Sequence, residues 1–122
     1  MERHLFEQLV AEALDTLPDV FLDKLDNVEV VVEDWPSQEV ILRAGVRSAA
    51  DLLGFYHGVP QAKRTHGYGL VLPDRISIYQ RPIEIHSRTT EDARRMIHRT
   101  LRHEIAHHFG IDDKRLRELG AY

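Results

Sequence analysis

The chain has 122 residues and no cysteine, and its 16 Lys and Arg stand against 20 Asp and Glu for a net charge of -4. The lack of cysteine excludes disulfides and thiolate metal ligands, and the negative charge disfavours nucleic acid as a partner. No apolar stretch has the length of a signal peptide or a membrane span. We therefore expect one folded domain over residues 1–122, located in the cytoplasm and without a membrane partner.

The first third of the chain predicts two helices and a strand. Apolar residues repeat at helical spacing over residues 3–16, which indicates an amphipathic helix. Pro18 suits the first turn of a second, short helix. The β-branched run Val28–Glu33 is typical of a strand.

The middle of the chain gives weaker signals. Residues 37–58 look helical, with interruptions at two glycines, and residues 60–69 are polar enough to predict a surface loop. Apolar and polar residues alternate over residues 74–80, which predicts a half-buried strand. Ile83 and Ile85 are expected to extend its pairing.

The last long helix is predicted to begin after Thr89, whose hydroxyl can cap it. Two acidic residues in its first turn favour the positive end of the helix dipole. One apolar stripe runs along this helix and is expected to face the core: Ala93, Ile97, Leu101 and Ile105.

The stretch from His103 to Asp113 reads H-E-x-x-H-x-x-G-x-x-D. On a helix, His103 and His107 face the same side and can bind one metal ion, and Glu104 lies beside them where it can reach a metal-bound water. Gly110 can adopt a left-handed conformation that ends the helix and turns the chain back. Asp113 is then the expected third ligand, which leaves a fourth position open for water, as in catalytic zinc sites.

Asp112 is the alternative to Asp113 as third ligand. It stands where an N-cap belongs for a short final helix over residues 113–119, and capping would occupy its carboxylate. Asp113 is therefore preferred.

The motif resembles that of the zincin metallopeptidases, and the Gly110 turn with a third ligand ten positions after His103 is most similar to the metzincin and Gly-zincin branch. The chain departs from metzincins in carrying Asp113 where they usually have His, and both methionines precede the motif, so it has no Met-turn. The resemblance is specific over residues 103–113. It implies a zincin-like α+β fold: helices packed on a small mixed β-sheet, with the metal-binding helix near the C-terminus.

The resemblance implies that the chain is a zinc-dependent metallopeptidase, which would bind one Zn²⁺ per chain and act on a peptide or protein substrate. Glu104 would act as general base, and Tyr79, His66 and Tyr68 are candidate oxyanion stabilisers. The strand with Ile76–Tyr79 could pair with an extended peptide.

Two alternatives differ in substrate or in class. A small metal-dependent endoribonuclease would share the helix and the metal ligands, although the net charge argues against RNA. A non-catalytic, zinc-stabilised interaction domain would instead surround the ion with four protein ligands.

Overall fold

The computed structural model describes residues 1–58 and 72–119. The predicted loop at 60–69, with His66 and Tyr68, lies outside these residues. The helices and strands follow in the order α1 (Arg3–Asp15), α2 (Asp19–Leu22), η1 (Asp23–Leu25), β1 (Val28–Glu33), α3 (Gln38–Ala44), η2 (Ala49–Asp51), β2 (Gly54–His57), β3 (Asp74–Tyr79), α5 (Gln80–His86), α6 (Thr90–His108) and α7 (Asp113–Glu118). None of these helices combines the length and the apolar character needed to cross a bilayer.

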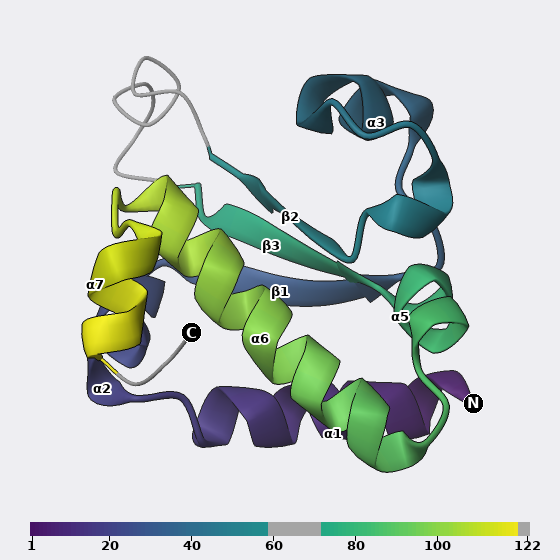
Figure 1. The fold of residues 1–122 in the computed structure, drawn as a ribbon, viewed down its shortest axis with the longest axis horizontal. Coiled ribbons are helices and arrows are strands. Elements are labelled where there is room, and N and C mark those ends of the chain that lie inside the picture. The colour runs from purple at the N-terminus through teal and green to yellow at the C-terminus, as the bar shows by residue number, and fades with distance from the viewer. Residues whose placement is uncertain (59–71, 120–122) are drawn as a thin grey trace.

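The three described strands form one mixed sheet in the order β1-β3-β2 (Figure 1). β1 runs parallel to β3, with Val28 opposite Asp74. β2 runs antiparallel to β3, with Gly54 opposite Ile78. The structure therefore confirms the expected α+β class with a small mixed sheet.

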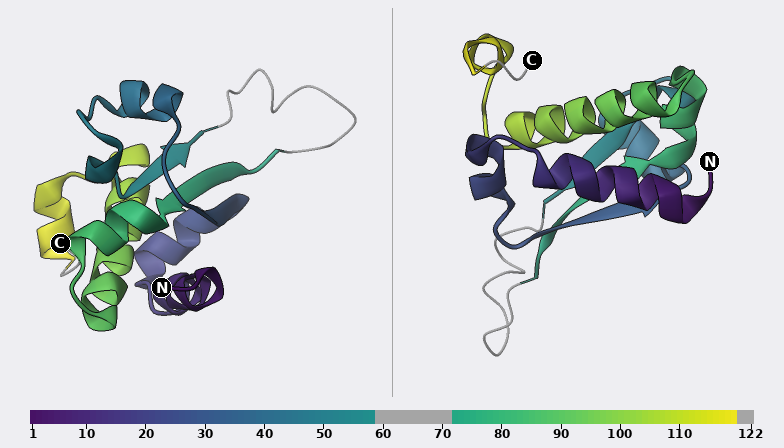
Figure 2. Two further views of the ribbon diagram at one scale, coloured as in Figure 1. Left: turned by 90° about the vertical axis from the view of Figure 1, so that its right-hand side faces the viewer. Right: turned by 90° about the horizontal axis from the view of Figure 1, so that it is seen from below.

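The core lies between the sheet and the two long helices. α6 crosses one face of the sheet with α1 beside it (Figures 1 and 2). From β3, Ile76 and Ile78 are fully buried toward these helices, and from α1, Phe6 is fully buried against them. This burial fixes α6, and with it the predicted metal motif, against the sheet.

Most elements confirm the predictions, but two segments differ. Residues 37–58, predicted as an interrupted helix, form α3 and η2 followed by the strand β2. β2 is too short to show the alternation of apolar and polar residues that predicts a strand, and it is held by its pairing with β3. Ile83 and Ile85 do not extend a strand but belong to α5, where Ile83 is buried and Ile85 is exposed. Pro82 fits the first turn of α5 because the N–H groups there have no partner within the helix.

The position of β3 corrects a further expectation. β3 lies between β1 and β2, so its hydrogen-bonding edges are both occupied. The strand with Ile76–Tyr79 cannot pair with a peptide substrate. Within the described sheet, β2 and β1 are the edge strands.

Candidate metal centre

α6 forms as the sequence predicts. The Thr89 hydroxyl caps it by accepting the Asp92 N–H at 3.0 Å, and Glu91 and Asp92 occupy the first turn. The predicted apolar stripe is buried throughout: Ala93, Ile97, Leu101 and Ile105. Because this stripe packs in the core, His103 and His107 lie on a different side of α6.

His103 and His107 lie next to each other on that side. Their ring centroids are 6.0 Å apart and their planes are inclined by 49°. His107 is exposed and His103 is partly buried. Two imidazoles bound to one tetrahedral zinc at the usual Zn–N length place their ring centroids about 5 Å apart, so these rings need only a small adjustment to share an ion.

The surroundings of His103 favour its neutral form. Burial lowers the pKa of His103, and the nearby guanidinium of Arg99 lowers it further. The carboxylate of Asp113 acts in the opposite direction on the same imidazole. A neutral imidazole is the form that binds metal, so the lowered pKa of His103 favours the protonation state that its predicted role requires.

Glu104 points from α6 toward the edge strand β2. Burial raises the pKa of Glu104 to about 7, and a hydrogen bond from the backbone N–H of Tyr56 partly opposes that shift. The Tyr79 N–H donates to the Leu53 carbonyl at 2.9 Å. Because paired and unpaired positions alternate along an antiparallel strand, Tyr56 turns its N–H away from β3. The Glu104 carboxylate therefore lies at the open edge of the sheet.

A glycine lets α6 approach β2 this closely. A Cβ at Gly54 would lie 2.7 Å from Cγ2 of Thr100 in α6 and 3.0 Å from the carbonyl oxygen of Ser77 in β3. Any larger residue at this position would push the helix and the strand apart.

The end of α6 has the predicted turn. Gly110 has a φ of 74°. The Ile111 N–H donates to the Ala106 carbonyl at 2.7 Å, and the Gly110 N–H donates to the His107 carbonyl at 3.4 Å. These two bonds form a Schellman motif, which ends the helix and redirects the chain toward α7.

The structure separates the roles of the two adjacent aspartates. Asp112 caps α7 by accepting the Arg115 N–H at 2.8 Å, as the sequence predicts. Asp113 is the first residue of α7, and its charge is felt by His103. Over residues 1–58 and 72–119, however, no three His, Cys, Asp or Glu side chains are close enough together to hold a metal ion. The third ligand therefore stays a prediction.

The zincin-like metallopeptidase family profile matches residues 25–121, which include all the helices and strands from β1 onward and the whole motif. The chain belongs to the zincin-like metallopeptidase family. A search of curated proteins finds no match to the sequence.

Membership of the zincin-like family implies a bound metal, typically zinc. The residues of this chain fit such an ion in two respects: the imidazoles of His103 and His107 lie side by side, and the Asp113 carboxylate at the start of α7 acts electrostatically on His103. Nitrogen and oxygen donors of this kind are those that zinc takes in proteins.

One cluster beside the zincin motif was not predicted. The Tyr56 hydroxyl donates to the buried Asp74 carboxylate at 2.7 Å, and the His108 ring stacks on Tyr56 with centroids 3.7 Å apart and an angle of 11°. His108 Nε2 lies 3.8 Å from Asp74 Oδ2. Tyr56 lies 18 positions before Asp74 in the sequence and His108 lies 34 positions after it, so no local spacing predicts the cluster. It joins the last turn of α6 to β2 and β3.

Proposed function

We propose that this zincin-like protein hydrolyses peptide bonds with the help of one zinc ion per chain. The observation that carries the proposal is the arrangement of His103, His107 and Glu104: two imidazoles side by side, with a partly buried carboxylate next to them at the open edge of β2. A general base, two nitrogen ligands and an edge strand are among the parts that metal-assisted peptide hydrolysis uses.

When bound, zinc would polarise the scissile carbonyl and lower the pKa of its water toward about 7. Glu104 would accept the proton from that water on its carboxylate and later donate it to the leaving amine. In the metal-free chain, burial raises the pKa of Glu104 to about 7, and the Tyr56 N–H holds one side of the carboxylate in place.

Asp113 would supply the third ligand, because Asp112 is occupied in capping α7. An aspartate adds a negative charge that a third imidazole would lack. The zinc should therefore be a weaker Lewis acid than in a three-histidine site, and we expect an activity optimum shifted toward higher pH.

His108 is not available as a fourth ligand. Its ring stacks on Tyr56 and lies beside Asp74, on the flank of α6 that faces the sheet. This supports a position left open for water and substrate, and argues against the closed shell of a structural zinc.

The substrate would bind along β2. Gly54 and Tyr56 turn their backbone groups away from β3. The Tyr56 N–H is already donated to Glu104, so an extended peptide would pair with the remaining groups of this edge, the N–H and carbonyl of Gly54 and the carbonyl of Tyr56. Tyr79 is 1% exposed and therefore unsuited to contact the substrate as an oxyanion stabiliser.

Two variants test the proposal directly. Glu104→Gln should retain about one zinc per chain and lose hydrolysis of a fluorogenic peptide library, whereas His107→Ala should lose both. Unchanged cleavage by Glu104→Gln would disprove the role of Glu104 as base. A protein that melts at lower temperature without zinc but cleaves no peptide would instead be the zinc-stabilised interaction domain.

A further inference from the structure

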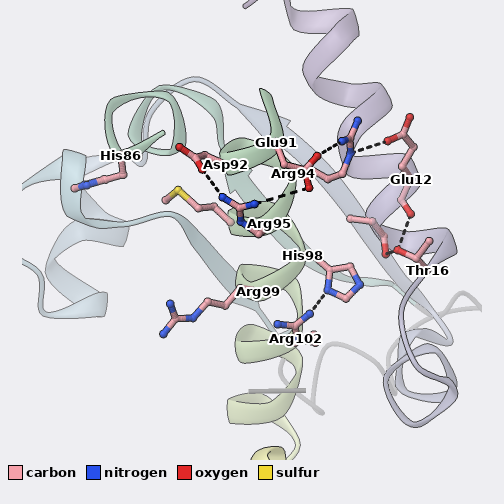
Figure 3. Close-up of a pocket in the computed structure, with 12 residues that line it drawn as sticks. Glu12, Thr16, His86, Glu91, Asp92, Arg94, Arg95, His98, Arg99 and Arg102 are labelled. Carbon is pink, nitrogen blue, oxygen red and sulfur yellow. Dashed lines mark hydrogen bonds and ion pairs between the residues drawn. The ribbon is translucent and has the colours of Figure 1, made fainter. Parts of the chain in front are cut away.

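A surface pocket of about 1030 Å³ lies along α6, between the C-terminal end of α1 and His86 of α5 (Figure 3). Four arginines of α6 line it: Arg94, Arg95, Arg99 and Arg102. Three carboxylates lie among them: Glu12, Glu91 and Asp92. Which of the arginines are already engaged decides what the pocket can bind.

Arg94 and Arg95 have acidic partners. Arg94 lies 2.5 Å from Glu91 and 3.3 Å from Glu12 of α1. Arg95 pairs with Asp92 and also lies 3.9 Å from Glu91. Their charges are thus largely neutralised within the pocket.

Arg102 is engaged differently, on the side of α6 toward α1. Its guanidinium donates to Nδ1 of His98 (Figure 3). His98 in turn hydrogen-bonds to the backbone of Thr16. This chain from α1 through His98 holds Arg102 in place.

Arg99 stands apart from the other three. In the described part of the chain, its guanidinium has no hydrogen-bond or ion-pair partner, and the residue is exposed. Figure 3 shows the Arg99 side chain directed away from His98 and the guanidinium of Arg102. Arg99 precedes His103 by four residues, so it lies about 6 Å before this ligand along the same ridge of the helix.

We propose that Arg99 is a specificity-determining residue that binds the carboxylate of an aspartate or glutamate side chain in the peptide substrate. The proposal rests on the proposed peptidase function. Thr100, next to Arg99 in α6, meets Gly54 at the start of β2, and Glu104 meets Tyr56 further along the same strand. From Thr100 to Glu104 the helix therefore follows β2, and a peptide paired with the edge of β2 would pass this part of α6. At about 3.3 Å per extended residue, the 6 Å between Arg99 and His103 places the acidic side chain within about two residues of the scissile bond.

The charges favour a single carboxylate over a nucleic-acid backbone. Of the lining cations, Arg94 and Arg95 are paired, and Glu12, Glu91 and Asp92 would repel a row of phosphates. One available guanidinium can bind one carboxylate through two parallel hydrogen bonds. RNA would need several such contacts in a row.

The experiment uses zinc-loaded Glu104→Gln protein, in which cleavage is blocked. The probes are fluorescein-labelled nonapeptides of alanine and glutamine that carry one Glu at successive positions, each matched by the peptide with Gln there. Fluorescence anisotropy gives the dissociation constants. At one or two positions, the Glu peptide should bind about fivefold tighter than its Gln counterpart.

Adding Arg99→Gln should abolish this preference and leave the affinity for the Gln peptides unchanged. Adding Arg95→Gln is the matched control, because Arg95 is already paired, and should keep the preference. Equal binding of Glu and Gln peptides, or a preference that survives Arg99→Gln, would overturn the role of Arg99. Tighter, Arg99-dependent binding of a labelled oligouridylate would also overturn it, in favour of a nucleic-acid site.

The outcome separates the two proposals. If the wild-type protein cleaves peptides without any preference for acidic residues, only the role of Arg99 fails. If the wild type cleaves none and Glu104→Gln binds none, the peptidase function fails and the inference fails with it.

Discussion

The Glu104 carboxylate accepts the backbone N–H of Tyr56, the residue whose outward-facing backbone forms the open edge of β2. One hydrogen bond thus joins the proposed general base to the strand that would hold the substrate. The base is positioned by the sheet as well as by its own helix, and any change in the distance between α6 and β2 should alter catalysis.

Glu104 should make the stability of the metal-free protein depend on pH. Its pKa is about 7 in the folded chain against a usual 4.5, because burial disfavours the charged form. The stability gained from the protonated form is complete below pH 4.5 and is lost as the pH rises through 7. Glu104→Gln should therefore unfold like the wild type at pH 4.5 and be more stable by up to about 3 kcal/mol at pH 8.

Urea unfolding with a chelator present measures this difference. Glu7→Gln, exposed on α1, is the matched control and should leave the pH profile unchanged. A stabilisation by Glu104→Gln that is the same at pH 4.5 and pH 8 would show that the carboxyl is not held in its protonated form by burial.

Gly54→Ala should push α6 away from β2. The new Cβ would meet Cγ2 of Thr100 at 2.7 Å, and we expect a loss of about 1–3 kcal/mol in the free energy of unfolding, with reduced peptidase activity. Thr100→Ser removes Cγ2, so the double variant Gly54→Ala/Thr100→Ser should recover part of the free energy of unfolding and part of the peptidase activity. Recovery stays partial because the Ser77 carbonyl is still 3.0 Å away. A double variant no better than Gly54→Ala would argue against this contact.

The turn at Gly110 can be tested against a second glycine with the same backbone. Gly110 and Gly45 have φ of 74° and 73°, and a Cβ at either meets nothing within 4 Å. Alanine at each should cost about 1 kcal/mol of stability through backbone strain alone. Only Gly110→Ala should also weaken zinc binding in a titration, since this turn leads to Asp113. Equal zinc affinity of Gly110→Ala and Gly45→Ala would show that the turn at Gly110 does not help to position a zinc ligand.

Substitution of Asp112 should affect stability, whereas substitution of Asp113 should affect zinc binding. Asp112→Ala removes the cap of α7 and should cost about 1 kcal/mol while zinc remains bound. Asp113→Asn keeps the shape of the side chain but removes its charge, so it should weaken zinc binding with little effect on stability. The reverse result, with zinc lost only in Asp112→Ala, would make Asp112 the third ligand.

The sequence predicts what depends on local spacing. The stripe and cap of α6, the left-handed turn at Gly110 and the cap at Asp112 all follow from residues within a few positions of one another, and the structure confirms each. The identity of the third ligand has no such local test.

What the sequence misses depends on partners far along the chain. β2 spans only four residues and is a strand because β3 pairs with it, so no period within Gly54–His57 could announce it. The position of β3 in the middle of the sheet, and the contact of Tyr56 with His108, likewise arise only when the chain is folded.

The most direct test of the central claim is the zinc content and coordination of the purified protein. Elemental analysis with X-ray absorption at the zinc edge should find one zinc per chain with two imidazoles, one carboxylate oxygen and one exchangeable oxygen. His103→Ala and His107→Ala should each lose the ion. A protein without zinc, or with an ion held by four protein ligands, would contradict the proposal that this site activates water.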